Sequence, residues 1–195
     1  MNETINLQII LGSTRQNRFG DKPAKWILET ARNKEGVSAE LIDLRDYPLP
    51  FFDEPMGPAN LQGRYSNEVA ARWAKKVAEA DAYIITAAEY NHGYTAVLKN
   101  ALDYAYQEWN NKPVGFVSWG GAMGTRAVEQ LREVAIELQM APIRNAVHIP
   151  SFWTLLDEKG NLKEGAFDPV RDSAEKFLDQ LLWWAKALKA ARAAQ

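Results

Sequence analysis

A polar loop rich in hydroxyl groups follows the first apolar stretch of the chain and could bind an anion. It spans residues 12–20 and leads into an expected helix, whose N-terminal N–H groups attract negative charge. Ser13 and Thr14 can donate hydrogen bonds to phosphate oxygens, and Arg15 or Arg18 can donate charge-assisted ones. The loop lacks the glycine pattern of dinucleotide-binding motifs, and the chain has no ATP-type P-loop. These residue types suit a terminal phosphate monoester; the alternative is an ordinary solvated turn.

Two further loops carry residue types that can hold a flat heterocycle. The residues of the first are Glu89, Tyr90, Asn91 and His92. An aromatic ring there could stack on a ligand while backbone groups bond the ligand's edge. The residues of the second are Ser118, Trp119, Gly120 and Gly121. Its glycines would let the backbone approach a ligand closely, and its N–H groups would stabilise negative charge on a ring edge. The alternative for the second loop is a simple strand-to-helix turn.

The periodicity of the chain predicts the elements that position these loops. Apolar, β-branched runs predict five strands over residues 5–11, 38–44, 82–87, 113–119 and 145–149. Amphipathic segments predict five helices over residues 22–33, 65–80, 95–106, 125–140 and 168–194. Asp21 is expected to cap the first helix, and residues 45–63 are expected to form a long surface excursion.

The alternation of these elements indicates the fold. Strands that are continuous apolar runs are buried on both faces, as in parallel sheets with helices on each side. With right-handed crossovers, the pattern predicts an α/β, doubly wound, five-stranded parallel sheet in the order 2-1-3-4-5. Ligands of such sheets bind at the carboxyl ends of the strands. The loops that begin at residues 12, 88 and 120 follow the first, third and fourth strands, so we expect them to form one site.

The composition limits the class of protein. The 195 residues suit one domain over residues 1–195, and a hydrophobic fraction of 47% allows one sizeable core. The formal net charge of −2 gives no indication of binding to nucleic acid or an anionic membrane, and no apolar run approaches the ~20 residues of a membrane helix. The absence of cysteine excludes disulfides and thiolate metal sites. It is compatible with the reducing cytoplasm, where we expect the protein to be located. The two histidines lack a metal-ligand spacing.

Three segments together resemble the NADPH-dependent FMN reductase family, which includes quinone, azo and chromate reductases. The first is Gly12-Ser13-Thr14-Arg15 with Arg18-Phe19-Gly20. The second is Glu89-Tyr90-Asn91 followed by Leu98-Lys99-Asn100-Ala101-Leu102-Asp103. The third comprises residues 113–121 and 126–132, and the resemblance covers residues 5–149. Members usually have a proline before the Glu-Tyr-Asn triplet, where this chain has Ala88, and a proline would stiffen the turn.

The resemblance implies a flavodoxin-like fold that binds flavin mononucleotide (FMN). It implies that the phosphate and ribityl chain are surrounded by Ser13, Arg15, Asn17 and Phe19. It implies that the isoalloxazine is lined by Glu89, Tyr90, Asn91 and His92. From the residue types we add Arg18 at the phosphate, and Ser118, Gly120 and Gly121 at the pyrimidine edge. His92 could instead cap the following helix.

The implied activity is that of an FMN-dependent NAD(P)H oxidoreductase. NADPH or NADH would give hydride to the flavin, and a small-molecule acceptor such as a quinone or free flavin would then take two electrons at the same face, with ping-pong kinetics. A homodimer or homotetramer is implied in the same way. The alternatives are a flavodoxin-type electron carrier without NAD(P)H turnover, against which the small net charge argues, and a flavin-binding scaffold without turnover. Trp183 and Trp184 are expected to pack against the sheet or a partner, and Trp153 could reach the site.

Overall fold

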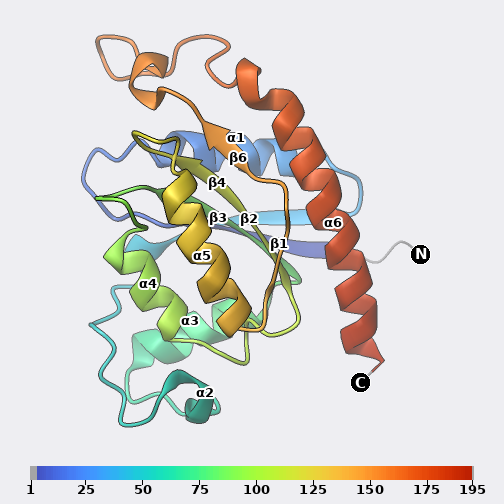
Figure 1. The fold of residues 1–195 in the computed structure, drawn as a ribbon. Coiled ribbons are helices and arrows are strands. Elements are labelled where there is room, and N and C mark those ends of the chain that lie inside the picture. The colour runs from blue at the N-terminus through green and yellow to red at the C-terminus, as the bar shows by residue number, and fades with distance from the viewer. Residues whose placement is uncertain (1–3, 195) are drawn as a thin grey trace.

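The computed structural model describes residues 4–194 and shows a parallel sheet with helices on both faces (Figure 1). The strands are β1 (Ile5–Leu11), β2 (Val37–Asp43), β3 (Ala82–Ala88), β4 (Pro113–Trp119), β5 (Ala141–Pro142) and β6 (Val147–Ile149). The α-helices are α1 (Asp21–Arg32), α2 (Pro58–Leu61), α3 (Glu68–Ala78), α4 (Ala96–Asp103), α5 (Thr125–Glu137) and α6 (Arg171–Ala193). Short 3-10 helices lie at Leu44–Asp46, Phe152–Leu155 and Asp168–Val170.

The sheet has the predicted order, with a correction at its last strand. The strands pair in parallel as β2-β1-β3-β4, and β5 and β6 both pair with β4. The strand expected over residues 145–149 is therefore shorter and shares the last position of the sheet with β5. Pro142 pairs with Val114, and the next pair in the ladder is Val147 with Val117. A proline has no N–H to donate, which is consistent with a break in the ladder at this point.

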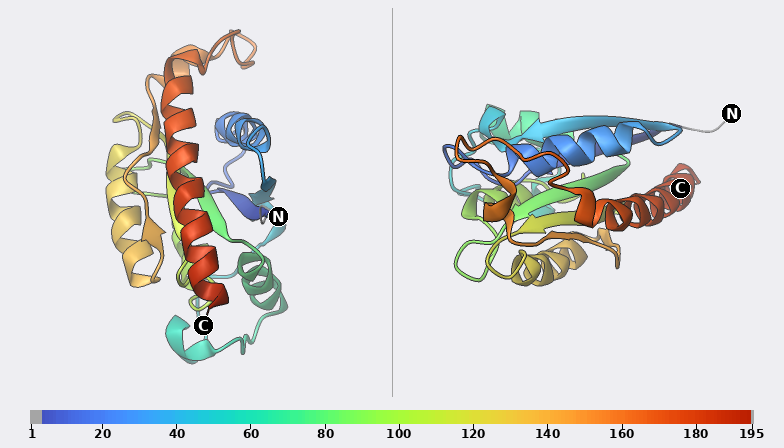
Figure 2. Two further views of the ribbon diagram at one scale, coloured as in Figure 1. Left: turned by 90° about the vertical axis from the view of Figure 1, so that its right-hand side faces the viewer. Right: turned by 90° about the horizontal axis from the view of Figure 1, so that it is seen from above.

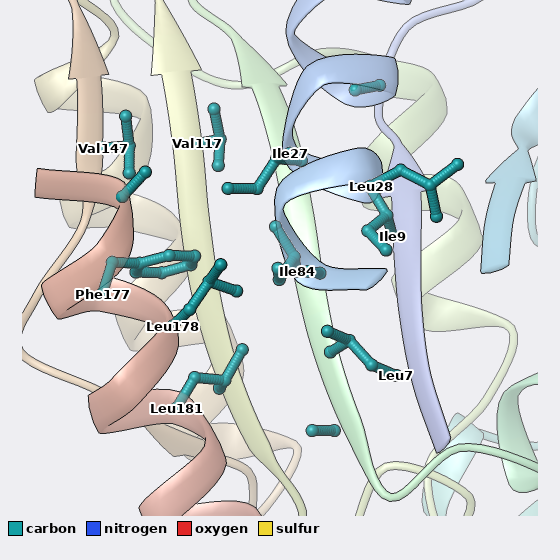
Figure 3. Packing of buried hydrophobic residues seen from close by; sticks show 14 of the residues in the cluster. Leu7, Ile9, Ile27, Leu28, Ile84, Val117, Val147, Phe177, Leu178 and Leu181 are labelled. Atoms are coloured by element: carbon teal, nitrogen blue, oxygen red, sulfur yellow. The ribbon is translucent and has the colours of Figure 1, made fainter. Parts of the chain in front are cut away.

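One face of the sheet is covered by α1 and α6, and Figure 2 shows α6 running along the length of the sheet. In Figure 3, Ile27 of α1 and Phe177 and Leu181 of α6 lie over the strands, and all three are fully buried. Burying each such side chain stabilises the fold by roughly 1.5–3 kcal/mol. Trp183 and Trp184 of α6 do not pack against the sheet, because they are 65% and 38% exposed.

The opposite face is covered by α3, α4 and α5, and its core includes two large aromatic side chains. Trp73 and Trp109 are fully buried. The indole N–H of Trp73 donates to the carbonyl of Ala101 at 2.7 Å, and that of Trp109 donates to the carbonyl of Leu102 at 3.2 Å. These bonds satisfy the polar atoms of the rings, so both can be buried without an unpaired donor.

Two helix starts differ from the predictions because of local hydrogen bonds. Gly20 precedes α1, so Asp21 lies inside its first turn, where its carboxylate accepts from Arg18 Nε at 3.1 Å rather than capping the helix. The helix expected from residue 65 begins only after Asn67. The Asn67 side chain accepts from the N–H of Val69 at 2.8 Å and of Ala70 at 3.3 Å, which fixes the start of α3.

The long excursion over residues 45–63 contains α2, and several side chains hold it to the body of the protein. Arg72 of α3 donates to the carbonyl of Asp46 at 2.7 Å. Asn100 donates from Nδ2 to the carbonyl of Pro50 at 2.6 Å and accepts at Oδ1 from the N–H of Phe52 at 2.9 Å. Asn100 therefore fixes the path of this segment. Among residues 4–194, none of the helices combines the length and the apolar character that crossing a bilayer requires.

The contact between β4 and α6 depends on a residue without a side chain. A Cβ atom at Gly115 would lie 2.3 Å from Cε2 and 2.6 Å from Cζ of the Phe177 ring. The two elements can pack at their observed distance only because position 115 is glycine.

We predict that Gly115→Ala destabilises the protein by about 1–3 kcal/mol, because the added methyl group would force the Phe177 ring and α6 away from the sheet. Urea unfolding followed by circular dichroism measures the change. Gly57→Ala is the matched control, since no atom lies within 4 Å of a Cβ atom built at Gly57. Equal stability of the two variants would show that this close contact is unimportant.

Candidate active site

Three loops meet where the adjacent parallel strands β1, β3 and β4 end. Together with the segment after β6 they form a cleft lined by Ser13, Arg15, Arg18, Phe19, Gly20, Ala88, Glu89, Tyr90, Trp119, Gly120 and Phe152. The sheet order explains the meeting, because parallel neighbouring strands bring their carboxyl ends to one edge. Hydrogen bonds continue from the strands into the loops: the Gly12 N–H donates to Thr86 at 3.0 Å, and the Glu89 N–H donates to Trp119 at 2.9 Å.

The loop after β1 is tied to the other elements at its start. The hydroxyl of Thr95, the residue that caps α4, donates to the carbonyl of Gly12. Ser13 is 1% exposed, and its hydroxyl lies 3.0 Å from the hydroxyl of Tyr90. The side chains of Ser13 and Tyr90 therefore join the first loop to the loop after β3.

Arg18 lies beneath this loop in a buried ion pair. It is 4% exposed; its Nη1 donates to Asp43 at 2.8 Å, and its Nη2 donates to Asp21 at 2.8 Å. It also donates to the carbonyl of Ser13. Burial alone would lower the pKa of Arg18, but the bonds to Asp43 and Asp21 hold that pKa above its ordinary value. Its guanidinium is thus engaged by protein groups, which favours a role in holding the loop.

Arg15 has a different environment from Arg18. Arg15 and Asn17 are exposed, and the carbonyls of Thr14 and Arg15 accept from Arg45 at 3.3 and 2.5 Å. The backbone N–H groups of Gln16, Asn17 and Phe19 donate to no acceptor within residues 4–194. Free donors together with an exposed cation, just before α1, form a site that suits a dianion.

The loop after β3 contains a tight two-residue turn. Tyr90 and Gly93 exchange backbone hydrogen bonds of 2.8 and 3.1 Å, and the residues between them, Asn91 and His92, have φ values of 49° and 77°. Both central residues of such a turn need positive φ, which asparagine tolerates better than most residues do. His92 does not cap the next helix, because Thr95 does so. Its ring instead lies 3.2 Å from Arg126 Nη1 through Nδ1.

Glu89 presents a buried carboxylate to the cleft. Its side chain is 3% exposed, and Oε1 accepts from Nε of Arg126 at 2.7 Å. The other oxygen, Oε2, is buried and has no hydrogen-bond partner within residues 4–194. Unpartnered buried carboxylate oxygens are rare in folded proteins, so this atom indicates that a donor is still to be supplied.

The loop after β4 lies against Glu89. A Cβ atom at Gly120, where φ is 155°, would lie 2.7 Å from Cβ of Glu89, so this approach requires glycine. Ser118 does not face the cleft: its hydroxyl donates to the carbonyl of Met123 at 2.9 Å and lies 2.8 Å from Nδ1 of His148. Burial, with the charge of Arg132 nearby, lowers the pKa of His148 below its ordinary value, so the imidazole is neutral at pH 7.

Aromatic rings form the side of the cleft near α1. Phe19 contacts Trp119 edge-on at a centroid distance of 5.8 Å and Phe152 at 5.0 Å. Phe152 lines the cleft, whereas the neighbouring Trp153 is 58% exposed. Trp119 was visible in the sequence as part of a glycine-rich loop. Phe152 had no such signal, because it follows a short edge strand in a segment without periodicity.

Comparison with known proteins adds an independent observation. The family model described as NADPH-dependent FMN reductase matches residues 5–154. The chain belongs to this family. A protein of Schizosaccharomyces pombe named as an NAD(P)H-dependent FMN reductase is 35% identical over 169 residues, which are 86% of this chain and 80% of that protein. An NADPH:quinone oxidoreductase of Arabidopsis thaliana is 30% identical over 141 residues, 70% of this chain and 69% of that protein.

Solved structures agree on the fold. FerB, a flavoenzyme NAD(P)H:(acceptor) oxidoreductase from Paracoccus denitrificans, has a TM-score of 0.70 at 19% identity, covering 91% of this chain and 97% of that chain. A flavodoxin from Pseudomonas aeruginosa has a TM-score of 0.51 at 16% identity, covering 91% of this chain and 99% of that chain. The predicted flavodoxin-like fold is confirmed. By family, the chain is an FMN-dependent NAD(P)H oxidoreductase, and the electron-carrier alternative is not favoured.

The structure brings together much of the predicted site of this reductase. The predicted residues that line the cleft are Ser13, Arg15, Arg18, Phe19, Glu89, Tyr90 and Gly120. The predicted residues that belong to the same three loops without lining it are Asn17, Asn91, His92, Ser118 and Gly121. The lining residues that the prediction did not include are Gly20, Ala88, Trp119 and Phe152. Ala88 pairs in register with Trp119 as the last residue of β3, so the missing proline leaves the strand intact.

Asp43→Asn is expected to lower the free energy of unfolding of the FMN-free protein by about 1–3 kcal/mol at pH 7, because it removes one carboxylate from buried Arg18. Burial on its own raises the pKa of Asp43, but bonds from Arg18 and from the N–H of Arg45 hold it below its ordinary value. A depressed pKa stabilises the fold above the unfolded-state pKa, near 4, and this contribution is lost as the pH falls through the folded-state value.

Urea unfolding at pH 7 and at low pH tests this prediction. The difference between the wild type and Asp43→Asn should shrink as the pH falls below about 4. Asp46→Asn is the control, since Asp46 is exposed three residues further along the chain. If Asp43→Asn lowers the free energy of unfolding equally at both pH values, the ionised Asp43 carboxylate does not stabilise the fold through Arg18.

Proposed function

We propose that the cleft holds FMN and that bound FMN passes electrons from NAD(P)H to quinone-type small molecules. One observation supports this assignment: the residues around the cleft leave three kinds of group without a partner within residues 4–194. These are the charge of exposed Arg15, the N–H groups of residues 16, 17 and 19, and the buried Oε2 of Glu89. FMN has a dianionic phosphate at one end and ring N–H and carbonyl groups at the other, which matches these features. The residues present therefore fit the cofactor.

At the phosphate end, the proposed ligands are the N–H groups of residues 16, 17 and 19 and the side chains of Ser13 and Arg15. Arg18 supports this loop from below through Asp43 and Asp21. The charge of Arg15 has no ion-pair partner within residues 4–194, so it is available to neutralise a phosphate.

At the ring end, the proposed ligands come from the loops after β3 and β4. The backbone around Tyr90 and Asn91 would hold the isoalloxazine, and Oε2 of Glu89 would accept from a polar group of the cofactor. The N–H groups of Gly121 and Ala122 donate to no acceptor within residues 4–194 and are candidates for the pyrimidine edge. Such donors would stabilise the negative charge of the reduced ring.

When bound, FMN supplies the chemistry, because it can take two electrons as hydride and return them to an acceptor. The protein binds and orients it, and the aromatic rings of Phe19, Trp119 and Phe152 keep water from one side of the cleft. Reductant and acceptor would use the same open side in turn, which predicts ping-pong kinetics. No side chain of the chain is needed as an acid, base or nucleophile for the hydride step.

Quinones are the acceptor class that the comparisons support. Similar proteins include quinone oxidoreductases of Solanum tuberosum and Arabidopsis thaliana and a 2-hydroxy-1,4-benzoquinone reductase of a Burkholderia species. A planar, two-electron acceptor of this kind suits stacking on a flat ring. We also propose that residues 1–195 form one FMN-binding domain, and that the chain assembles as a homodimer or homotetramer, for which the exposed Phe51 and Trp183 offer apolar contact surface.

The purified protein loaded with FMN is expected to lose its visible flavin absorbance rapidly when NADPH or NADH is added without oxygen, and to regain it when a benzoquinone is added. Stopped-flow absorbance follows both half-reactions. Bound flavin that stays oxidised with either nucleotide would favour a carrier or scaffold. Protein that cannot be loaded with FMN would overturn the proposed function.

Arg15→Gln is expected to weaken FMN binding by about 10- to 100-fold, because it removes a charge-assisted bond to the phosphate. Quenching of FMN fluorescence measures the dissociation constant. The unfolding free energy of the FMN-free protein should change by less than about 0.5 kcal/mol, since the side chain is exposed. Arg144→Gln, the same change at an exposed position outside the cleft, is the control. Equal affinities of the two variants for FMN would show that Arg15 does not bind the phosphate.

A further inference from the structure

The first turns of α5 hold the loop after β3 from outside the cleft. Arg126 donates from Nε to Oε1 of Glu89 at 2.7 Å, and its Nη1 lies 3.2 Å from Nδ1 of His92. One turn further along the helix, Gln130 donates to the backbone carbonyl of His92 at 3.1 Å. These contacts come from the motif over residues 126–132, to which the proposed function gives no role.

The ion pair between Arg126 and Glu89 is asymmetric. The Glu89 side chain is 3% exposed and the Arg126 side chain is 40% exposed, so the cation approaches from solvent and the carboxylate lies inside. Among residues 4–194, Arg126 is the one ion-pair partner of Glu89. Because Oε1 is occupied by Arg126, the orientation of the carboxylate is fixed and Oε2 is left free and buried.

The same guanidinium stabilises an unfavourable backbone. His92 has a φ of 77°, in the left-handed region that is unfavourable for a residue with a Cβ atom. Such a conformation persists when its surroundings fix it, and here the contacts to the His92 ring and carbonyl come from Arg126 and Gln130. Nη1 of Arg126 can only donate, so Nδ1 of His92 is the acceptor in this contact.

We propose that Arg126 is a positioning residue for the flavin. This proposal rests on the proposed function of the cleft. Arg126 compensates the charge of Glu89, fixes the orientation of the Glu89 carboxylate and holds the turn of Asn91 and His92 in place beside the cleft. It acts through these residues and does not itself touch the reacting atoms. The core contacts of α5 are made by other side chains, among them Val128, Leu131 and Ala135, so α5 can stay packed without Arg126.

The experiment is a double-mutant cycle on FMN binding with the variants Arg126→Gln, Glu89→Gln and the double variant. Arg126→Gln should weaken FMN binding by about 10- to 100-fold, because the buried carboxylate loses the one counter-charge that residues 4–194 give it. In the Glu89→Gln background the same change should weaken binding by less than about threefold, since there is no charge left to compensate. Arg126→Lys should give an intermediate affinity, because lysine keeps the charge but not the forked geometry.

The midpoint potential of bound FMN gives a readout that a merely structural role would not move. In Arg126→Gln the uncompensated carboxylate should make the reduced, anionic flavin less favourable and the potential more negative, and the double variant should restore it towards the wild-type value. Arg144→Gln is the matched control for loss of an arginine. Circular dichroism of each FMN-free variant confirms folding.

The outcomes distinguish a failure of FMN binding from a failure of the positioning role of Arg126. If the wild type does not bind FMN, the proposed function fails. If the wild type binds FMN and Arg126→Gln binds it equally well, or if the effects of Arg126→Gln and Glu89→Gln simply add, the positioning role is wrong while the proposed function stands. If Arg126→Gln does not fold, the same cycle is run with Arg126→Lys in its place, alone and combined with Glu89→Gln.

Discussion

The parallel pairing of β1, β3 and β4 is the constraint on which the site depends. It brings three loops that are far apart in the sequence to one edge of the sheet, and the ladder continues into them through the N–H groups of Gly12 and Glu89. The loops can approach each other because Gly120 has no side chain next to Glu89. The cleft is therefore built directly on the ends of the strands, which fix where its loops begin.

Charge is distributed around the cleft in a regular way. On one side, Arg18 is neutralised by Asp43 and Asp21 beneath the first loop; on the other, Glu89 is neutralised by Arg126 at the edge of α5. Both groups hold a loop in place; Arg126 balances Glu89, whereas the two carboxylates around Arg18 leave one negative charge over. Arg15 has no ion-pair partner within residues 4–194, so its charge is available at the end where a phosphate would bind, although the chain as a whole has a formal charge of −2.

Most of the fold and seven of the eleven residues that line the cleft follow from the sequence. Apolar runs in the sequence predict the buried strands. Glycine and asparagine in the loops after them predict turns that need positive φ values. The sequence could not separate Arg15 from Arg18, because both stand in the same loop and only the approach of Asp43, from the end of β2, buries one of them. Nor could it choose Phe152 over Trp153. A 3-10 helix over Phe152–Leu155 decides which ring points inward, and so short an element leaves no periodicity.

α6 follows all the described strands of the sheet in the sequence, which has a consequence for biosynthesis. Phe177 and its neighbours on α6 cover the face of β4 beside α1, and Phe152, from the segment just before, completes the aromatic side of the cleft. During translation the strands and the loops after β1, β3 and β4 leave the ribosome well before this helix does, so one face of the nascent sheet has only α1 to cover it. The core on this face, and the Phe152 side of the cleft, are therefore completed only after the loops that would hold a flavin have been synthesised.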